Sequence, residues 1–388
     1  MKIAIIIERF DKRLGGAETS VGELAEELRK RGIEATLLVA KSNTKDSHVI
    51  ELCSDIAGKR VSLRHFEAAL KLHLSQNHYD IIHSVLPFDF ADVYQPRGGA
   101  YPEAAIRNAE SYQSRIAVIL KKITSFLNFR RSELLNAESK LCQPKNKTTV
   151  LCLSEYVAKQ FAKHYNLSSD RIRIIVNGVN TDKSATDCVG KISIDLANKG
   201  WLNAPDRNTL FLFAGHNFRL KGLDCLMKAM NVAIANRPRT APKLIIAGSG
   251  NQQKYLKLAN KLGITDNVFF AGPVSNIKAV LPICDVAVLP TFYDPCSRFI
   301  LEALATPIPA ITTMFNGASD LFENNTHGKI IDRPENIIAL AAAISDYCEP
   351  ANRQSAVKAI VADSICRKVS IQRHADELVE FYTGLTKS

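Results

Sequence analysis

The sequence has 388 residues and lacks the marks of several specialised protein classes. No apolar run approaches the roughly 18 residues needed to cross a bilayer, and the apolar core at 2–7 is too short for a signal peptide. The nine cysteines are scattered and never spaced Cys-x-x-Cys. That pattern excludes a disulfide framework and a zinc site and favours reduced thiols in the cytosol. No short-period repeat or low-complexity segment occurs, which excludes a repeat architecture.

The composition that remains is that of a soluble globular protein with an excess of positive charge. Hydrophobic residues make up 46% of the chain and charged residues 23%. Fifty Lys and Arg residues stand against thirty-nine Asp and Glu, for a formal charge of +11. Three kinds of partner attract such a chain: a nucleic acid, an anionic membrane surface or a negatively charged substrate.

The first half of the chain alternates apolar strands with amphipathic helices. The apolar run at 2–7 is typical of a parallel strand that is buried on both faces. Apolar residues then recur at helical spacing over 17–32, with Gly32 as the expected C-cap. We predict a further helix at 64–75 and strands at 35–40, 81–84, 150–154 and 172–176. This order indicates an open parallel sheet.

The same pattern restarts after a polar stretch at about 180–207. Apolar strands separated by helical patterns are predicted at 209–214, 243–247, 268–271, 286–289 and 309–312. We therefore predict the α/β class, with two doubly wound Rossmann-like domains at 1–180 and 198–365 and a final helix within 368–388 that packs on either one. Such sheets bind ligands at the carboxyl ends of their strands, so the functional residues are expected in the loops that follow the strands.

Glycine-rich loops follow two of these strands. Gly248-Ser249-Gly250 resembles the start of a dinucleotide fingerprint, but Gln253 stands where the third glycine belongs, so we interpret it as a tight turn. Gly15-Gly16 follows the first strand and opens a helix, where backbone N–H groups and the helix dipole favour an anion. A glycine pair alone also suits a purely structural turn.

The second domain carries stronger signals for an anionic ligand. Its first strand runs into Gly215, and the loop that follows holds Arg219 and Lys221. An Arg fork and a Lys point charge suit a diphosphate. After the strand at 286–289, Asp294 precedes a helix and Glu302 lies about two turns inside it, so the two carboxylates are placed to reach different parts of one extended ligand.

Together these motifs resemble the retaining GT-B glycosyltransferases of family GT4. The resemblance rests on the glycine pair at 15–16, the Arg219/Lys221 loop, the two acids eight positions apart and Asn177-Gly178-Val179-Asn180 at the domain junction. It covers nearly the whole chain in the right order and is strongest to bacterial transferases that add glucose to the heptose of the lipopolysaccharide core. It implies two Rossmann-like domains whose parallel sheets face a cleft, with the acceptor bound by the first and a nucleotide sugar by the second.

The resemblance assigns roles to individual residues of this chain. Glu302 matches the acid that holds the donor ribose, and Asp294 matches the acid that binds the transferred sugar, with a side chain one methylene shorter than the usual Glu. Lys221, together with Arg219, matches the pair that neutralises the leaving diphosphate. The remaining residues implied to bind the donor are Gly15, Gly16, Gly215, Gly272, Val274, Ser297, Arg298 and Phe299.

The implied reaction needs no metal and no protein nucleophile. The leaving diphosphate helps to deprotonate the acceptor hydroxyl, and the cations stabilise the charge that develops on it. No Asp-x-Asp motif occurs, which argues against a metal-bound diphosphate, so no cofactor is expected. Arg97, in the glycine-rich loop 94–99, is a candidate for binding an acceptor phosphate. His83 suits either the cleft or the core, and His216 either a ligand contact or packing.

The positive charge is concentrated in the first domain, where residues 1–180 hold 27 Lys and Arg against 20 Asp and Glu. Within 115–131, apolar residues at helical spacing are flanked by basic ones that include Lys121 and Lys122. Such a segment either lies in an anionic bilayer interface or packs its apolar stripe in the core. The resemblance favours the interface. It implies a peripheral enzyme on the cytoplasmic face of the inner membrane that acts on a phosphorylated glycolipid.

The leading hypothesis is a glycosyltransferase that moves a hexose from UDP-glucose to a lipid-linked saccharide. A sugar-nucleotide epimerase of the same architecture is an alternative and would consume the donor without an acceptor. A nucleic-acid-binding protein is suggested by charge alone. No zinc-finger spacing or RNA-binding aromatic motif supports it, so we expect no nucleic-acid partner.

Overall fold

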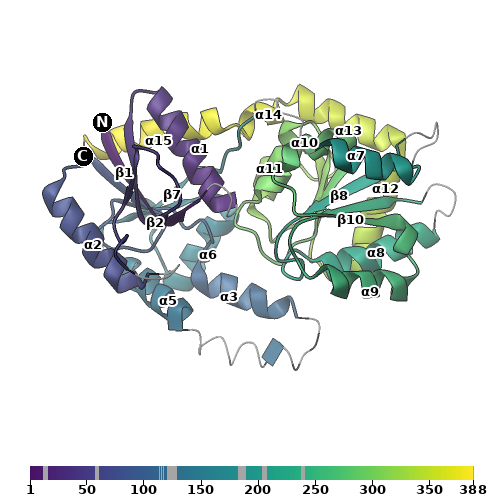
Figure 1. Cartoon of the computed structure of the whole chain (residues 1–388), viewed down its shortest axis with the longest axis horizontal. Coiled ribbons are helices and arrows are strands. Elements are labelled where there is room, and N and C mark those ends of the chain that lie inside the picture. Colours follow the sequence, from purple (N-terminus) through teal and green to yellow (C-terminus); the bar gives the residue numbers. More distant parts are fainter. Residues whose placement is uncertain are drawn as a thin grey trace. The chain divides into compact units, whose positions relative to one another are not determined.

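The computed structural model of the chain describes residues 1–11, 16–56, 61–112, 114, 116, 118–119, 129–181, 189–202, 208–236 and 241–387. It divides into two compact units, each built around one parallel sheet with helices packed against it (Figure 1). The first unit comprises Met1–Ala109, Arg115–Asn180 and Ile371–Ser388, and the second comprises Glu110–Ser114 and Thr181–Ser370. The predicted class, α/β with two doubly wound domains, is confirmed.

The first unit holds a seven-stranded sheet in the order β3-β2-β1-β4-β5-β6-β7. Its strands are β1 (Lys2–Phe10), β2 (Glu34–Ser42), β3 (Val49–Glu51), β4 (Ile81–Ser84), β5 (Val93–Tyr94), β6 (Thr149–Cys152) and β7 (Ile172–Ile174). Its helices include α1 (Gly16–Lys30), α2 (Leu63–Gln76), α3 (Tyr101–Glu110), α5 (Phe129–Leu141), α6 (Glu155–Tyr165) and α15 (Ile371–Leu385).

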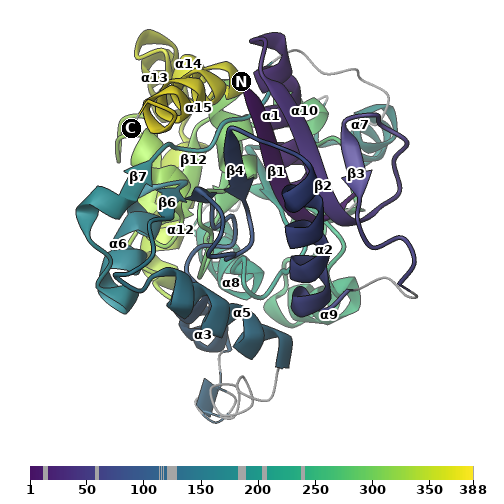
Figure 2. The same cartoon turned by 90° about the vertical axis from the view of Figure 1, so that its left-hand side faces the viewer.

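Both faces of β1 are buried, which explains its continuous apolar sequence. On one face Ile3 and Ile5 pack with residues of α1 and of the C-terminal helix α15. On the other face Ala4 and Ile6 pack with residues of α2. Figure 2 shows α1 and α2 running along the sheet beside β1 and β2. The alternation of side chains along one strand therefore supplies two separate cores.

A buried carboxylate links four elements of the first unit. Glu138 of α5 is fully buried and accepts hydrogen bonds from Tyr94 Oη at 2.8 Å, Tyr165 Oη at 2.5 Å and the Tyr101 backbone N–H at 2.8 Å. Burial raises the pKa of Glu138 to about 7, although all three hydrogen bonds favour its charged form. The carboxylate thus joins α5 to β5, α3 and α6.

The second unit holds a six-stranded sheet in the order β10-β9-β8-β11-β12-β13. Its strands are β8 (Leu210–Ala214), β9 (Lys243–Ala247), β10 (Val268–Gly272), β11 (Val286–Leu289), β12 (Ala310–Thr313) and β13 (Gly328–Ile331). Its helices are α7 (Val189–Asn198), α8 (Leu223–Ala235), α9 (Gln252–Leu262), α10 (Ile277–Val280), α11 (Arg298–Ala305), α12 (Ile337–Cys348), α13 (Pro350–Ala362) and α14 (Ile365–Lys368).

Strand order reverses once in each sheet, between β1 and β4 and between β8 and β11. Ligands of open α/β sheets bind outside the carboxyl ends of the strands at such a point. In the second unit a ligand is therefore expected at the loops that follow β8 and β11, which hold Lys221 and Asp294.

Three further features of the described residues bear on function. The eight cysteines in the described ranges are all free thiols. Among the described residues, no helix is both long and apolar enough to cross a membrane. The same residues contain no group of three or more His, Cys, Asp or Glu side chains arranged to hold a metal ion.

Candidate functional site

The loops after β8 and β11 meet at the switch point of the second sheet. The Lys221 Nζ lies 2.6 Å from the Asp294 Oδ2 and 3.4 Å from the carbonyl oxygen of Tyr293. The backbones are joined as well, because the Phe292 N–H donates to the Leu220 carbonyl at 2.9 Å. A cation from one predicted motif and a carboxylate from the other therefore form one ion pair.

Two glycines allow this close approach. Gly222 has a φ of +78°, and a Cβ on it would lie 1.9 Å from the Pro290 carbonyl oxygen. Any other residue at this position pays for the left-handed backbone and also displaces the loop after β11. A Cβ on Gly215 would lie 3.1 Å from the Lys221 Cγ, so the stem of that lysine packs directly against the end of β8.

A buried asparagine outside the predicted motifs holds the loop after β11. Asn316 is fully buried, and its Oδ1 accepts hydrogen bonds from the N–H groups of Ser297 and Ala318, both at 3.1 Å. Its flanking residues also bind the loop, since the Asp294 N–H donates to the Phe315 carbonyl at 2.9 Å. Sequence reasoning missed Asn316. Its position just after the predicted strand at 309–312 was the available signal.

The helix α11 presents the second carboxylate. Glu302 is 6% exposed, and its Oε1 lies 3.1 Å from the Arg298 Nη2, one turn earlier on the helix. Ser297 occupies the N-cap without a side-chain capping hydrogen bond, and Phe299 is buried beside it. The dipole of the helix favours an anion at this end.

Arg219 makes different contacts from Lys221. Its guanidinium donates to the Ser111 hydroxyl and lies 3.7 Å from the centroid of the Tyr112 ring. Both contacts belong to the segment Glu110–Ser114 of the second unit. Stacking on an aromatic ring suits a guanidinium, which is planar and weakly hydrated. The ion pair with Asp294 is thus made by Lys221, while Arg219 binds Ser111 and stacks on Tyr112.

Three further predicted residues lie at the ends of strands β8 and β10 or in the loops that follow them: His216, Gly272 and Val274. His216 is exposed, and its Nδ1 lies 2.9 Å from the Ser249 Oγ, so it is not a core histidine. The carbonyl of Gly272 accepts a hydrogen bond from the Gly248 N–H at 2.7 Å. This contact joins the loop after β9 to the end of β10, and Val274, two residues on, is partly exposed.

In the first unit, Arg97 is held by a residue of α1. Its Nη1 lies 2.6 Å from the Ser20 Oγ, which in turn lies 3.3 Å from the Asn177 Oδ1. Ser20 and Asn177 are both almost fully buried. Gly16 is the first residue of α1, one turn before Ser20, whereas Gly15 lies outside the described residues. Arg97 is therefore fixed beside α1, the helix that begins at Gly16.

His83 belongs to the core. It is fully buried, and its Nδ1 lies 2.5 Å from the Tyr382 hydroxyl of α15. Burial first, and the charge of Arg97 second, lower the pKa of His83 to about 3. The same two causes contribute to lowering the pKa of His374 on α15. Arg373 also lowers the pKa of His374, more strongly than Arg97 does. Both imidazoles are therefore neutral, and the positive charge near them belongs to Arg97 and Arg373.

The basic segment predicted at 115–131 lies mostly outside the described residues, and Lys121 and Lys122 are among those left out. Two apolar residues of its stripe are described. The side chains of Ile116 and Ile119 have relative exposures of 71% and 58%.

Comparison with protein families identifies both halves of the chain. The family described as Glycosyltransferase Family 4 matches residues 14–183, and the family described as Glycosyl transferases group 1 matches residues 197–360. An uncharacterized glycosyltransferase of Methanocaldococcus jannaschii is 27% identical over 182 residues, which are 46% of this chain and 45% of that protein. The lipopolysaccharide glucosyltransferase WaaG of Escherichia coli is 23% identical over 187 residues, 48% of this chain and 49% of that protein. The chain thus spans about half the length of the curated relatives it matches.

Solved structures show the same fold over the full length. The crystal structure of WaaG, described as a glycosyltransferase of lipopolysaccharide biosynthesis, superposes with a TM-score of 0.76 at 17% identity, covering 98% of this chain and 100% of that one. Anabaena Alr3699/HepE in complex with UDP and glucose superposes with a TM-score of 0.67 at 17% identity, covering 99% and 100%. With a family 4 match over its first half, a group 1 match over its second and this fold throughout, the chain belongs to the GT-B glycosyltransferases of the GT4 type.

Proposed function

We propose that the protein is a retaining glycosyltransferase that moves glucose from UDP-glucose to a hydroxyl of a lipid-linked saccharide such as the lipopolysaccharide inner core. The observation that carries this proposal is the meeting of Lys221 with Asp294 at the switch point of the second sheet, beside the helix that holds Glu302. The names of two relatives support the substrates, since one is a lipopolysaccharide glucosyltransferase and another was crystallised with UDP-glucose.

Each charged group of the site has a task in this reaction. Glu302 accepts hydrogen bonds from the ribose hydroxyls of the donor, and Asp294 accepts them from hydroxyls of the transferred sugar. Lys221 stabilises the negative charge that grows on the diphosphate as the glycosidic bond breaks. Because Asp294 already holds the Nζ at 2.6 Å, little reorganisation of the ammonium group is needed during the reaction.

The acceptor hydroxyl attacks from the face that the diphosphate leaves, and a diphosphate oxygen takes its proton. Arg219 adds a second cation for the diphosphate. The backbone around Ser297, Arg298 and Phe299 binds phosphate at the positive end of α11. The remaining donor contacts come from Gly15, Gly16 and Gly215 and, at the nucleotide base, from Gly272 and Val274. Cations take the place of a metal ion, so we propose that transfer continues in EDTA.

The first unit binds the acceptor in this proposal. Arg97 binds an acceptor phosphate, because Ser20 fixes its guanidinium and its neutral histidine neighbours do not compete as cations. An anion at this position compensates a charge that is partly withdrawn from water.

We also propose that the segment 115–131 lies in an anionic bilayer interface on the cytoplasmic face. The exposure of Ile116 and Ile119 supports this interpretation over packing in the core. Changing Lys121 and Lys122 together to Glu should weaken binding to vesicles of anionic lipid, at about 1 kcal/mol for each basic residue lost near the surface. Equal binding of the variant and the wild type contradicts membrane contact through this segment.

The transfer reaction is tested with UDP-glucose and a heptose-containing glycolipid acceptor in the presence of EDTA. Acceptor-dependent release of UDP, with the α-anomer retained in the product, is the expected result. Lys221→Ala and Glu302→Ala should each abolish transfer, while Lys261→Ala, an exposed lysine of α9, should keep it. Full activity in either site variant contradicts the assignment. Consumption of UDP-glucose without an acceptor identifies the epimerase alternative instead.

A further inference from the structure

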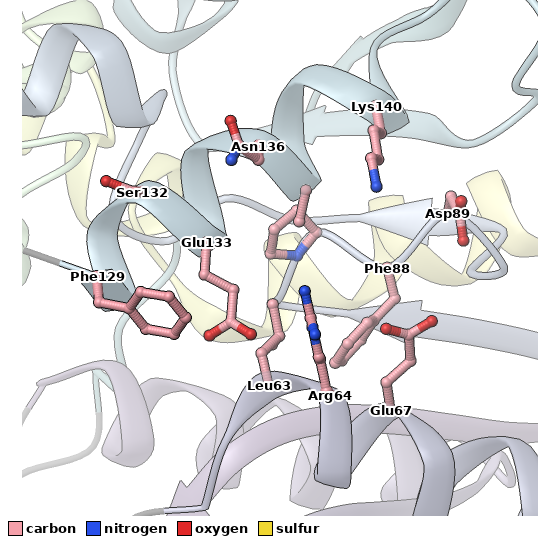
Figure 3. Close-up of a pocket in the computed structure, with 12 residues that line it drawn as sticks. Leu63, Arg64, Glu67, Phe88, Asp89, Phe129, Ser132, Glu133, Asn136 and Lys140 are labelled. Atoms are coloured by element: carbon pink, nitrogen blue, oxygen red, sulfur yellow. The ribbon is translucent and has the colours of Figure 1, made fainter. Parts of the chain in front are cut away.

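A separate cavity of about 290 Å³ lies in the first unit. Its walls come from the first turns of α2, the loop after β4 and the length of α5. Figure 3 shows Arg64 and Glu67 extending from α2 on one side and Glu133 and Lys140 from α5 on the other. This volume lies at the lower end of the range for small-molecule sites, which corresponds to a ligand the size of a single sugar ring.

Two aromatic rings line the cavity, and they differ in how far they are exposed to solvent. Phe88 is 3% exposed and is stacked on Phe90 with ring centroids 5.2 Å apart, so its position is fixed by the core. Phe129, at the first position of α5, is 79% exposed. Burying such a ring contributes roughly 1.5–3 kcal/mol, which this side chain forgoes in the free protein. A ligand that covers Phe129 recovers part of that free energy.

The polar side chains around the cavity carry both signs of charge. Lys71, which does not line the cavity, forms an ion pair with Glu67, with its Nζ 2.6 Å from the Glu67 Oε1. The side chains of Asp89, Glu133 and Arg64 make no hydrogen bond or ion pair within the described part of the chain, and the same holds for Asn136 and Lys140. Hydrogen-bond acceptors and donors therefore surround one space without satisfying one another.

The presence of both signs of charge around the cavity favours a neutral ligand over a charged one. An anion would face the carboxylates of Glu67, Asp89 and Glu133, and a cation would face Arg64 and Lys140, so either charge meets repulsion as well as attraction. A neutral sugar avoids this conflict. Its hydroxyls donate to the carboxylates and accept from the cations and the amide, while its C–H face covers an aromatic ring.

We propose that the cavity between α2 and α5 is a binding site for one neutral pyranose, separate from the residues assigned to the donor. Its assignment to a sugar of the acceptor rests on the proposed function, whereas the binding itself does not. Phe129 lines the cavity where the segment 115–131 passes into α5, at the edge of the proposed membrane contact, and supplies the stacking surface. Glu133, Asn136 and Arg64 supply the hydrogen bonds. The site thereby selects a glycan by a sugar other than the one that receives glucose.

The proposal is tested by saturation-transfer NMR on the full chain without a donor, using methyl α-D-glucopyranoside and methyl α-D-mannopyranoside as probes. We expect saturable binding of a neutral probe and at least tenfold weaker binding in Phe129→Ala and in Glu133→Gln. Exposed residues elsewhere provide matched controls: Ile338→Ala at the start of α12 and Glu380→Gln on α15 should bind as the wild type does.

Each other outcome overturns the proposal. Tighter binding of glucosamine than of the neutral probes, lost in the same variants, assigns the cavity to a cation, and tighter binding of glucose 6-phosphate assigns it to an anion. Absence of saturable neutral binding, or binding that Phe129→Ala and Glu133→Gln leave unchanged, refutes the site. Calorimetry of UDP-glucose on the same samples separates the two proposals, because donor binding can persist when this one fails.

Discussion

Replacing Asn316 with alanine removes the side chain that holds the loop after β11 in place. The amide is fully buried, accepts hydrogen bonds from the Ser297 and Ala318 N–H groups at 3.1 Å, and donates to the Thr312 hydroxyl at 2.9 Å. Alanine leaves both backbone donors without this acceptor. A buried donor left unsatisfied costs about 1–3 kcal/mol, so the loss of the acceptor for two donors should lower the free energy of unfolding by about 2–6 kcal/mol.

The same substitution should weaken donor binding. Ser297 is the N-cap of α11, and the residues on either side of Asn316 bind the backbone of Asp294, so both carboxylates of the proposed donor site depend on Asn316. We expect UDP-glucose to bind at least tenfold more weakly, which corresponds to about 1.4 kcal/mol.

Urea unfolding measures the first effect, and isothermal titration calorimetry measures the second. Asn231→Ala is the matched control, since the side chain of Asn231 in α8 makes no hydrogen bond within the described ranges. The reasoning is refuted by an Asn316→Ala protein that unfolds within 0.5 kcal/mol of the wild type, roughly the spread of an ordinary surface change, and binds UDP-glucose equally well.

Two further predictions concern stability. Gly222→Ala should cost clearly more than Gly263→Ala, because both glycines are left-handed but only the Cβ on Gly222 meets a carbonyl, at 1.9 Å. If both variants lose the same free energy of unfolding, about 1–2 kcal/mol as expected for the left-handed backbone alone, the contact with the carbonyl is contradicted. Folding raises the pKa of Glu138 from 4.5 to about 7, so the unfolded chain loses this proton at lower pH than the folded protein does. The free energy of unfolding should therefore fall by about 3 kcal/mol as the pH rises from 4.5 to 7. Glu138→Gln should flatten this dependence, and parallel curves for the two proteins would show that Glu138 is not its source.

Much of the fold was predictable from apolar runs alone. The strands at 243–247 and 286–289 coincide with β9 and β11, because a strand buried on both faces needs continuous apolar sequence. The short strands β3, β5 and β13 were missed. β5 consists of Val93 and Tyr94 only and is defined by its pairing with His83 and Ser84, which no local pattern encodes.

The candidate site was predictable in its parts but not in its contacts. Spacing after two strands singled out Lys221 and Asp294, while their 2.6 Å contact depends on the sheet order that places β8 beside β11. Asn316 was missed because its role lies in hydrogen bonds to a loop nineteen positions away. The bond from Arg97 to Ser20 likewise joins segments 77 positions apart.

We propose that the second unit binds a nucleotide sugar through Lys221 and Glu302 without a metal ion. Titration of UDP-glucose into the wild-type protein in EDTA, with Lys221→Ala and Glu302→Ala beside it, is the most direct test. We expect saturable binding by the wild type and a loss of at least tenfold in each variant, with Lys261→Ala unchanged. Equal affinity in the wild type and both site variants, or binding that requires a divalent cation, would contradict it.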